Sequence, residues 1–205
     1  MCGFAGFVGE VENREQVLEN MIDTIIHRGP DSSGKFVDED AALGFRRLSI
    51  IDLSESGDQP LYNEDRSKVL VFNGEIYNYQ ELREELIQAG HTFVSNTDSE
   101  TLIHGYEQWG EELVYRLRGM YAFAIWDTKK KRLFAARDIF GIKPLYYANM
   151  NGTLMFASEI KAFMEHPKFD KVFNEDALGN YLSFQFVPTN ETFFKGVFCV
   201  QPGHY

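Results

Sequence analysis

A cysteine stands directly behind the initiator methionine in the opening stretch MCGFAGFVG, and an apolar run follows it at once. If Met1 is removed, Cys2 carries both a thiol and the free α-amine. Such an amine can take the thiol proton directly or through a water molecule, so one residue would supply a nucleophile and its base. The alternative is a cysteine without a role at a frayed terminus, although frayed termini are usually polar.

An Asn-Gly pair follows an apolar run in VFNGEIYNY (71–79). This pair is first of all a turn signal, and that interpretation takes most of the weight. The functional interpretation is an oxyanion hole, in which Asn73 supplies a side-chain amide and Gly74 a backbone N–H. A glycine there would also let the backbone approach a ligand closely.

Three charged residues stand where a binding site could use them, each with a simpler explanation. FRRLSIID (45–52) holds two arginines in an apolar strand, and alternation places Arg46 and Arg47 on opposite faces. One can line a pocket and bind a carboxylate while the other is solvated, but periodicity does not say which. Most strand arginines are surface residues. Asp98, in NTDSE, fits the first turn of a helix, where an acid favours the helix dipole without any ligand.

The bulk composition indicates a globular protein that acts on a small molecule. The 205 residues include 31 acidic and 20 basic side chains, and the net charge of −11 disfavours nucleic acid and anionic membranes as partners. Two cysteines are too few for a disulfide framework. The chain shows neither a secretory signal nor an apolar run of membrane-spanning length. We therefore expect a cytoplasmic location.

Motifs for metals and nucleotides are absent from the sequence. The five histidines (27, 91, 104, 166, 204) show no spacing typical of metal ligands, so we expect no metal site. Phosphate-binding, dinucleotide and Gly-x-Ser-x-Gly motifs are also missing. Cys199, within GVFCV, fits a buried strand.

The expected elements follow the order strand, helices, strands, which favours an α+β fold with stacked antiparallel sheets and helices outside. The loop HRGPDSSG (27–34) should separate the first helix from the next strand. Capping pairs are expected at Asn13/Gln16, Asn78/Glu81 and Thr97/Glu100. Strands are predicted around 4–8, 41–51, 69–73, 120–127, 132–138, 144–150, 154–159 and 197–200, and helices around 13–26, 78–90, 97–110, 159–165 and 175–184.

Taken together, several segments resemble the glutaminase domain of glutamine-hydrolysing asparagine synthetases, a branch of the class II glutamine amidotransferases. They are MCGFAGFVG, HRGPDSSG, RRLSIIDLSESGDQPL, NGEIYNYQELREEL, TDSETLIHGYEQWG, LRGMYAFAIWD and ARDIFGIKPLYY. The match runs in order over about residues 2–165, and RLSI, NGEIYN and GIKPLYY are specific to this branch. The resemblance implies a four-layer αββα sandwich of N-terminal-nucleophile hydrolases, with two antiparallel sheets between helices.

The resemblance also implies a role for each motif position. Cys2 would attack the side-chain amide of glutamine, with its α-amine moving protons, and Asn73 and Gly74 would hold the oxyanion. Arg47 would pair with the substrate α-carboxylate. Asp98, helped by Glu75, would bind the α-ammonium. The pocket would be completed by main-chain groups of Leu48, Ser49, Ile50 and Ile51, and its wall would be shaped by HRGPD (27–31).

The implied organisation is a glutaminase core over 2–167 and a connecting tail over 168–205. In the family an ATP-using synthetase domain follows, whereas this chain stops at QPGHY, so we expect an excised domain or a truncated product. Accordingly, we expect no cofactor in this domain, with ATP and Mg only in the missing synthetase domain. Expected partners are glutamine and that synthetase domain, with a homodimer as a possible assembly.

Two rival functions remain open at this stage. A different N-terminal-nucleophile amidohydrolase would keep Cys2 but use another pocket. A module that binds an amino acid or a partner without catalysis would tolerate a retained Met1, because a blocked amine disables the base.

Overall fold

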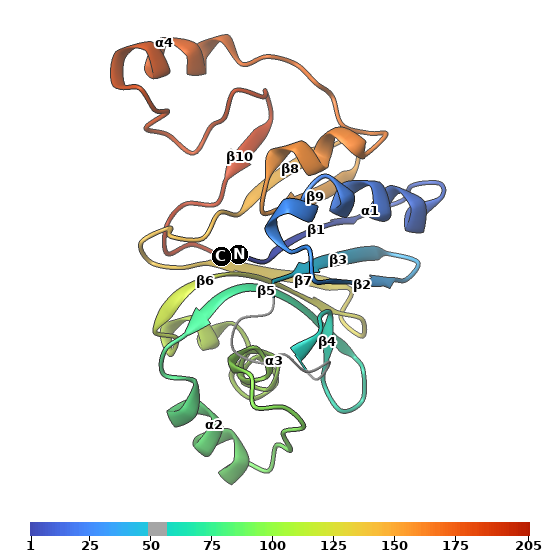
Figure 1. Cartoon of the computed structure of the whole chain (residues 1–205), viewed down its shortest axis with the longest axis vertical. Coiled ribbons are helices and arrows are strands. Elements are labelled where there is room, and N and C mark those ends of the chain that lie inside the picture. Colours follow the sequence, from blue (N-terminus) through green and yellow to red (C-terminus); the bar gives the residue numbers. More distant parts are fainter. Residues whose placement is uncertain (49–56) are drawn as a thin grey trace.

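The computed structural model describes residues 1–48 and 57–205, and two antiparallel sheets form its centre. The first sheet has the strand order β10-β8-β9-β1-β3-β2 and the second the order β4-β5-β6-β7. Figure 1 shows the sheets stacked in the middle of the molecule, with α1 on one side and α2 and α3 on the other. The first sheet contains β1 (Gly3–Val8), β2 (Ser32–Val37), β3 (Ala41–Arg47), β8 (Tyr146–Met150), β9 (Thr153–Ala157) and β10 (Val197–Cys199). The second contains β4 (Leu61–Tyr62), β5 (Lys68–Ile76), β6 (Gly119–Asp127) and β7 (Arg132–Arg137).

Helices complete the outer layers. The first sheet is covered by α1 (Arg14–Asp23) and the 3-10 helix η4 (Ile160–Glu165), and η1 (Ile26–Arg28) follows α1. The second sheet is covered by α2 (Tyr79–Gln88), α3 (Asp98–Trp109) and the 3-10 helix η3 (Gly110–Tyr115). The last helix, α4 (Glu175–Phe184), lies at the far end of the molecule in Figure 1. In the described residues no helix is long and apolar enough to cross a membrane.

Strand β1 explains why the apolar run begins next to the terminus. It pairs with β3 on one side and β9 on the other, so it is a central strand. Phe4 packs between the two sheets, whereas Ala5 and Phe7 pack beneath α1. Because both faces of the strand are buried, its residues are apolar without alternation.

Strand β5 shows the same two-sided burial in the second sheet. Val69 and Val71 lie between the sheets, and Leu70 and Phe72 pack against the helical side. Since successive side chains point to opposite faces, Asn73 falls on the face between the sheets. The strand therefore brings a buried amide toward the end of β1.

The predicted α+β sandwich of two antiparallel sheets between helices is confirmed, but two strands were missed, β2 and the two-residue β4, which lies in a stretch expected to be a polar connection. Residues 27–34 were expected to form a loop, whereas β2 begins at Ser32. This strand lies at the sheet edge, and its residues alternate between half-buried and exposed. Its Ser, Gly and Lys residues conceal the strand from a search for apolar runs. Residues 159–165 form a 3-10 helix rather than an α-helix.

The helices begin where the capping pairs predict, but the predicted side-chain capping hydrogen bonds are wrong. Asn13, Asn78 and Thr97 occupy the expected N-cap positions, but none makes a side-chain capping hydrogen bond. The side chain of Asn78 instead bonds the backbone of Arg116 and Arg118 across the fold. At Asn78, tertiary partners therefore replace the local bond on which the capping rule rests, whereas Thr97 bonds the side chains of neighbouring Ser95 and Ser99.

The segment 168–205 is partly built into the sandwich. Its strand β10 pairs with β8 at the edge of the first sheet, and Arg137 donates to the carbonyl of Val200. The boundary between residues 167 and 168 stays a prediction.

Candidate functional site

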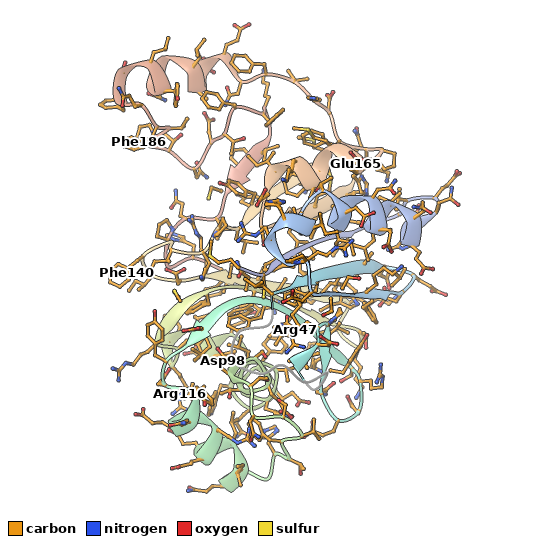
Figure 2. The ribbon with its side chains drawn as sticks, viewed as in Figure 1. Arg47, Asp98, Arg116, Phe140, Glu165 and Phe186 are labelled. Atoms are coloured by element: carbon orange, nitrogen blue, oxygen red, sulfur yellow. The ribbon has the colours of Figure 1, made fainter. Side chains whose placement is uncertain are left out.

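The predicted site residues described by the structure meet in one cavity of about 230 Å³. Cys2 precedes β1, Arg47 ends β3, and Asn73 lies in β5, so three strands deliver their polar groups to one end of the sandwich. Figure 2 shows Arg47 and Asp98 near each other in the middle of the molecule, far from Phe186. The predicted residues that line the cavity are Cys2, Arg47, Leu48, Asn73, Gly74, Glu75 and Asp98. The predicted residues Ser49, Ile50 and Ile51 lie outside the described residues.

The Cys2 thiol is held between backbone groups at the end of β3. The N–H of Leu48 donates to Cys2 Sγ at 3.3 Å, and Sγ lies 3.5 Å from the Leu48 carbonyl oxygen. Arg28 Nε donates to the Cys2 carbonyl at 2.9 Å, and its guanidinium pairs with Glu159 at 3.0 Å. Residues 27–31, predicted to shape the wall, do not line the cavity, but Arg28 from this segment fixes the backbone of Cys2.

Met1 lines the same cavity while it remains attached. Its Sδ lies 3.4 Å from Lys143 Nζ. In this form the nitrogen of Cys2 is part of a peptide bond, and its lone pair is delocalised into the carbonyl, so it does not act as a base. The base proposed for Cys2 therefore requires removal of Met1.

The amide of Asn73 supports its predicted role as an oxyanion donor. Asn73 is only 2% exposed, and its Nδ2 makes no hydrogen bond to any described residue. A buried amide donor without a partner costs about 1–3 kcal/mol, so such groups are rare outside functional sites.

Gly74 is required at its position by close backbone packing. A Cβ there would lie 2.2 Å from the Met120 carbonyl oxygen and 2.7 Å from the Cα of Tyr121. The glycine thus reflects the tight approach of β6 as well as the cavity that it lines. The turn interpretation of Asn73-Gly74 is wrong, because both residues continue β5.

The structure decides which of the two arginines faces the cavity. Arg47 lines it, and its Nη1 lies 2.8 Å from Oδ1 of Asp58, which also accepts the Ser32 hydroxyl at 2.9 Å. Arg46 points the opposite way and bonds the Ile22 carbonyl and the Asp23 carboxylate at the end of α1. The bond to Asp58 orients the guanidinium, whose planar fork has the geometry that suits a carboxylate.

Asp98 opens α3 and faces the cavity beside Glu75. Its Oδ2 accepts the N–H of Ile76 at 2.8 Å. Burial raises the pKa of Asp98 to about 6, and the charge of Glu75 adds to the rise, while the Ile76 bond opposes it. A carboxylate with a raised pKa in a cavity is a candidate ligand for a cation.

Sequence reasoning missed three residues that shape this cavity or hold its side chains: Asp58, Gln59 and Lys143. Gln59 accepts from the Phe72 N–H at 2.6 Å and donates to the Phe72 carbonyl at 3.2 Å. The Gln59 amide thus bonds both backbone groups of Phe72, as a neighbouring strand would, and fixes the backbone next to Asn73. All three act through contacts between distant segments, so no local spacing could have revealed them.

Two larger cavities, of about 600 and 490 Å³, lie along the 187–205 segment. Cys199 lines both, and its thiol lies 3.0 Å from Arg137 Nη1. Burial raises the pKa of the Cys199 thiol, although Arg137 opposes that rise. This thiol is therefore a weaker nucleophile candidate, and Cys2 remains the better one.

Two antiparallel sheets between helices, with Cys2 directly before the central strand β1, make up the fold and carry the candidate site. The family of the glutamine amidotransferase domain matches residues 1–205, so the chain belongs to that family. A curated relative, asparagine synthetase [glutamine-hydrolyzing] 1 of Bacillus subtilis, is 48% identical over 99% of this chain and 33% of its own length. Amidase chry2 of Gibberella zeae is 36% identical over 100% of this chain and 32% of its own length. The chain thus spans about a third of these relatives.

A solved structure supports the fold. Glutamine phosphoribosylpyrophosphate amidotransferase from Bacillus subtilis superposes with a TM-score of 0.70, covering 84% of this chain and 45% of the other. Its sequence identity of 23% makes this a likeness of fold alone.

Proposed function

We propose that this domain hydrolyses the side-chain amide of glutamine to glutamate and ammonia through a Cys2 thioester. The observation that carries the proposal is the buried Asn73 Nδ2, which has no partner among the described residues and lines the same cavity as the Cys2 thiol. Family membership supports the same reaction.

The reaction begins with attack of the Cys2 sulfur on the amide carbon, while the thiol proton passes to the α-amine of Cys2. The carbonyl π bond opens, and the oxyanion is held by Asn73 Nδ2 and the Gly74 N–H. Collapse breaks the C–N bond, and the protonated amine gives its proton to the departing ammonia. A γ-glutamyl thioester remains on Cys2.

The second half repeats these roles with water as the nucleophile. The α-amine takes a proton from water, the oxygen attacks the thioester carbon, and the C–S bond breaks as the thiol is regenerated. Glutamate leaves. Every proton in this cycle is carried by Cys2, so we expect no cofactor in this domain.

Selectivity for glutamine would rest on the two charged groups of the substrate's α-carbon. Arg47 supplies donors for the carboxylate, and Asp98 with Glu75 supplies negative charge for the ammonium. Leu48 and the neighbouring Ser49, Ile50 and Ile51 would add main-chain contacts. Arg47→Ala should therefore raise KM strongly, whereas Arg46→Ala, which alters the contact with α1, should not.

The first test is glutamate release from glutamine by protein whose mass shows that Met1 is absent. We expect activity that disappears in Cys2→Ala and persists in Cys199→Ala, the matched loss of the other thiol. Activity that survives in Cys2→Ala would overturn the proposal. Hydrolysis of other amides in preference to glutamine would instead favour a general amidohydrolase, a possibility raised by the relatives that are named amidases.

In a longer protein, we propose that the ammonia serves ATP-dependent asparagine synthesis. The support is that relatives named asparagine synthetases are about three times as long as this chain. ATP and Mg would then be needed only by the synthetase domain. A cytoplasmic location and a homodimer belong to the same proposal.

A further inference from the structure

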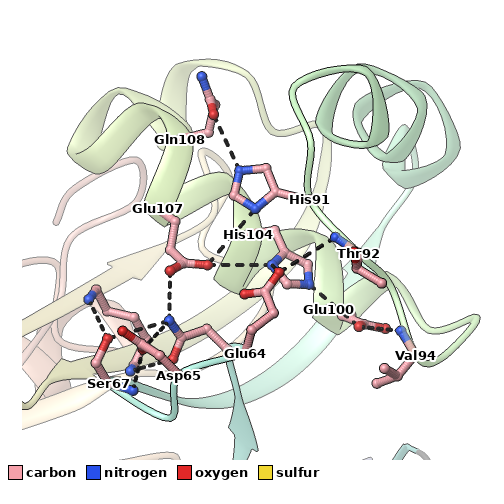
Figure 3. A network of polar contacts seen from close by, with 12 residues as sticks. Glu64, Asp65, Ser67, His91, Thr92, Val94, Glu100, His104, Glu107 and Gln108 are labelled. Atoms are coloured by element: carbon pink, nitrogen blue, oxygen red, sulfur yellow. Dashed lines mark hydrogen bonds and ion pairs between the residues drawn. The ribbon is translucent and has the colours of Figure 1, made fainter.

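A second cluster of titratable side chains lies on the outer side of the second sheet, away from Cys2. It joins Glu64 from the turn before β5, His91 from the segment after α2, and His104 and Glu107 from α3. One nitrogen or oxygen atom from each residue lies within 4.8 Å of all the others. Figure 3 shows the four side chains pointing toward one another.

His104 presents an unused ring nitrogen to the centre of this cluster. The residue is 2% exposed, and its Nε2 faces the Glu100 carboxylate at 3.5 Å. Its Nδ1 is buried and makes no hydrogen bond within residues 1–48 and 57–205. That Nδ1 lies 3.6 Å from Glu64 Oε1 and 3.5 Å from Glu107 Oε2, but neither contact is a hydrogen bond.

His91 is oriented in the same manner. Its Nε2 lies 3.2 Å from the Gln108 side-chain oxygen, which can accept a hydrogen only if Nε2 carries it. The lone pair then belongs to Nδ1, which faces Glu107 Oε2 at 4.0 Å. Both histidines thus have Nε2 assigned to an oxygen acceptor and Nδ1 turned inward, as outer-sphere partners fix histidine ligands in metal sites.

The two carboxylates are also positioned by neighbours. Glu107 Oε1 accepts a hydrogen bond from Asn63 Nδ2 at 2.6 Å, which leaves Oε2 directed at the histidines. The backbone N–H of Thr92 points to Glu64 Oε1 at 3.5 Å. Each of the four side chains therefore has a partner that holds it in place.

We propose that Glu64, His91, His104 and Glu107 bind one divalent transition-metal ion, with zinc as the best match. Two imidazoles and two carboxylates are ligands that such ions accept, and two carboxylates balance the double charge. Bonds of about 2.0–2.2 Å to a tetrahedral ion place neighbouring ligand atoms about 3.3–3.6 Å apart. The separations of 3.5 and 3.6 Å around His104 fit this geometry, whereas the 4.0 Å contact of His91 and the remaining pairs, all within 4.8 Å, require the ligands to close around the ion.

The competitor for this position is a proton on His104. Burial opposes its charge, but Glu100 and Glu107 outweigh burial and raise the pKa of His104 to about 9. Glu64, Glu100 and Glu107 surround the ring, so the cluster needs a cation of some kind. Binding of a metal and retention of a proton give different measurable results.

The test is calorimetric titration of metal-free protein with Zn²⁺ in a Cys2→Ala, Cys199→Ala background, which removes the two thiols that could bind the ion. We expect one Zn²⁺ per chain and a rise in melting temperature on binding. Co²⁺ in the same protein should give the intense visible absorption of a four-coordinate ion without a sulfur charge-transfer band.

Variants with the least risk to folding are Glu64→Gln and His91→Gln, because both side chains reach the surface. Each should weaken Zn²⁺ binding by more than about tenfold and remove the thermal shift. The matched controls Glu84→Gln and His204→Gln alter exposed residues of the same types and should change neither. The proposal is overturned if the folded parent binds no Zn²⁺ at micromolar concentrations, which would leave the proton as the resident cation. The proposal would also be overturned if Glu64→Gln and His91→Gln both bound Zn²⁺ as tightly as the parent protein does.

Discussion

Asp98 and Glu100 lie two residues apart at the start of α3, yet the pKa values of their carboxyl groups move in opposite directions. Burial raises the pKa of Asp98 to about 6, with Glu75 as its charged neighbour. Burial also opposes ionisation of Glu100, but hydrogen bonds from His104, Ser95 and Val94 outweigh it and lower the pKa to about 2. Position on a helix therefore does not decide the charge state of an acid; the groups that face it do.

The two carboxyl groups belong to different regions of the molecule. The carboxylate of Glu100 is hydrogen-bonded to neighbouring protein groups, whereas Asp98 lines the cavity that we propose for the ligand. Glu100 receives N–H donors from Val94 and Ser95 and the Ser95 hydroxyl at 2.6–2.7 Å. Asp98 and Asn73 face a cavity, and Asn73 Nδ2 has no hydrogen-bond partner among the described residues. Substitutions in the two regions should therefore affect different measurements.

The largest expected effect comes from Asn73→Ala. Loss of an oxyanion donor costs about 10²–10³ in kcat, because the bond is made chiefly in the transition state. The free energy of unfolding should change far less, since Nδ2 has no hydrogen bond among the described residues to lose. Steady-state kinetics and urea unfolding measure the two quantities. A fall in kcat of less than tenfold would remove Asn73 from this role.

Asp98→Asn should weaken binding and stabilise the fold together. We expect KM for glutamine to rise about 10–100-fold through loss of a charged hydrogen bond. Because the folded pKa of Asp98 is raised from 3.8 to about 6, its ionised form costs stability fully above pH 6 and not at all below about pH 4. The neutral amide should therefore add about 1–3 kcal/mol at pH 8.

Thermal unfolding of wild type and Asp98→Asn across this pH range provides the measurement. The stability difference should shrink as the pH falls from 7 to 4. A constant difference would mean that the charge of Asp98 is not its source.

Glu100→Gln should do the opposite and lower stability without a comparable loss of kcat. The variant removes a buried charge that accepts hydrogen bonds from Val94, Ser95 and His104, at a cost of about 1–2 kcal/mol at neutral pH. Since the folded pKa lies below the ordinary 4.5, this stabilisation is present above pH 4.5 and is lost as the pH falls through 2. Chemical unfolding at pH 7 and pH 3 should show the difference narrowing. Equal destabilisation at both values would contradict an electrostatic origin.

The smallest expected effect is a pH dependence of the Kd for glutamine in protein that retains Asp98. With a pKa of about 6, half of Asp98 is protonated at pH 6, so Kd for glutamine should about double relative to pH 7.5. Titration calorimetry with Cys2→Ala measures this binding without turnover. Asp98→Asn in the same background is the control, and its Kd should stay level over this interval.

The sequence was most informative where local pattern and burial agree. β1, β5 and β6 are continuous apolar strands, and their prediction is confirmed along with the sandwich. Alternation correctly separated Arg46 from Arg47, and the structure supplied the choice between the two faces. The grouping of Cys2, Asn73 and Asp98 came from the family resemblance, and the structure brings these residues to one cavity.

The remaining features depend on contacts that no local rule contains. Glu100 was predicted to pair with Thr97 in a helix cap. In the structure its carboxylate instead accepts the backbone N–H groups of Val94 and Ser95. The Gln59 side chain bonds the backbone of β5 only because the fold places it beside Phe72. Histidine spacing argued against a metal, but the proposed ligands come from three separate segments.

The central position of β1 also orders events during synthesis of the chain. Its first partner, β3, follows after about forty residues, but its second partner, β9, is Thr153–Ala157. At about 5–20 residues per second, a ribosome needs roughly 8–30 s to reach that strand after β1 has been made. One edge of an apolar strand stays unpaired throughout this interval, which is the period when a chaperone has most to protect.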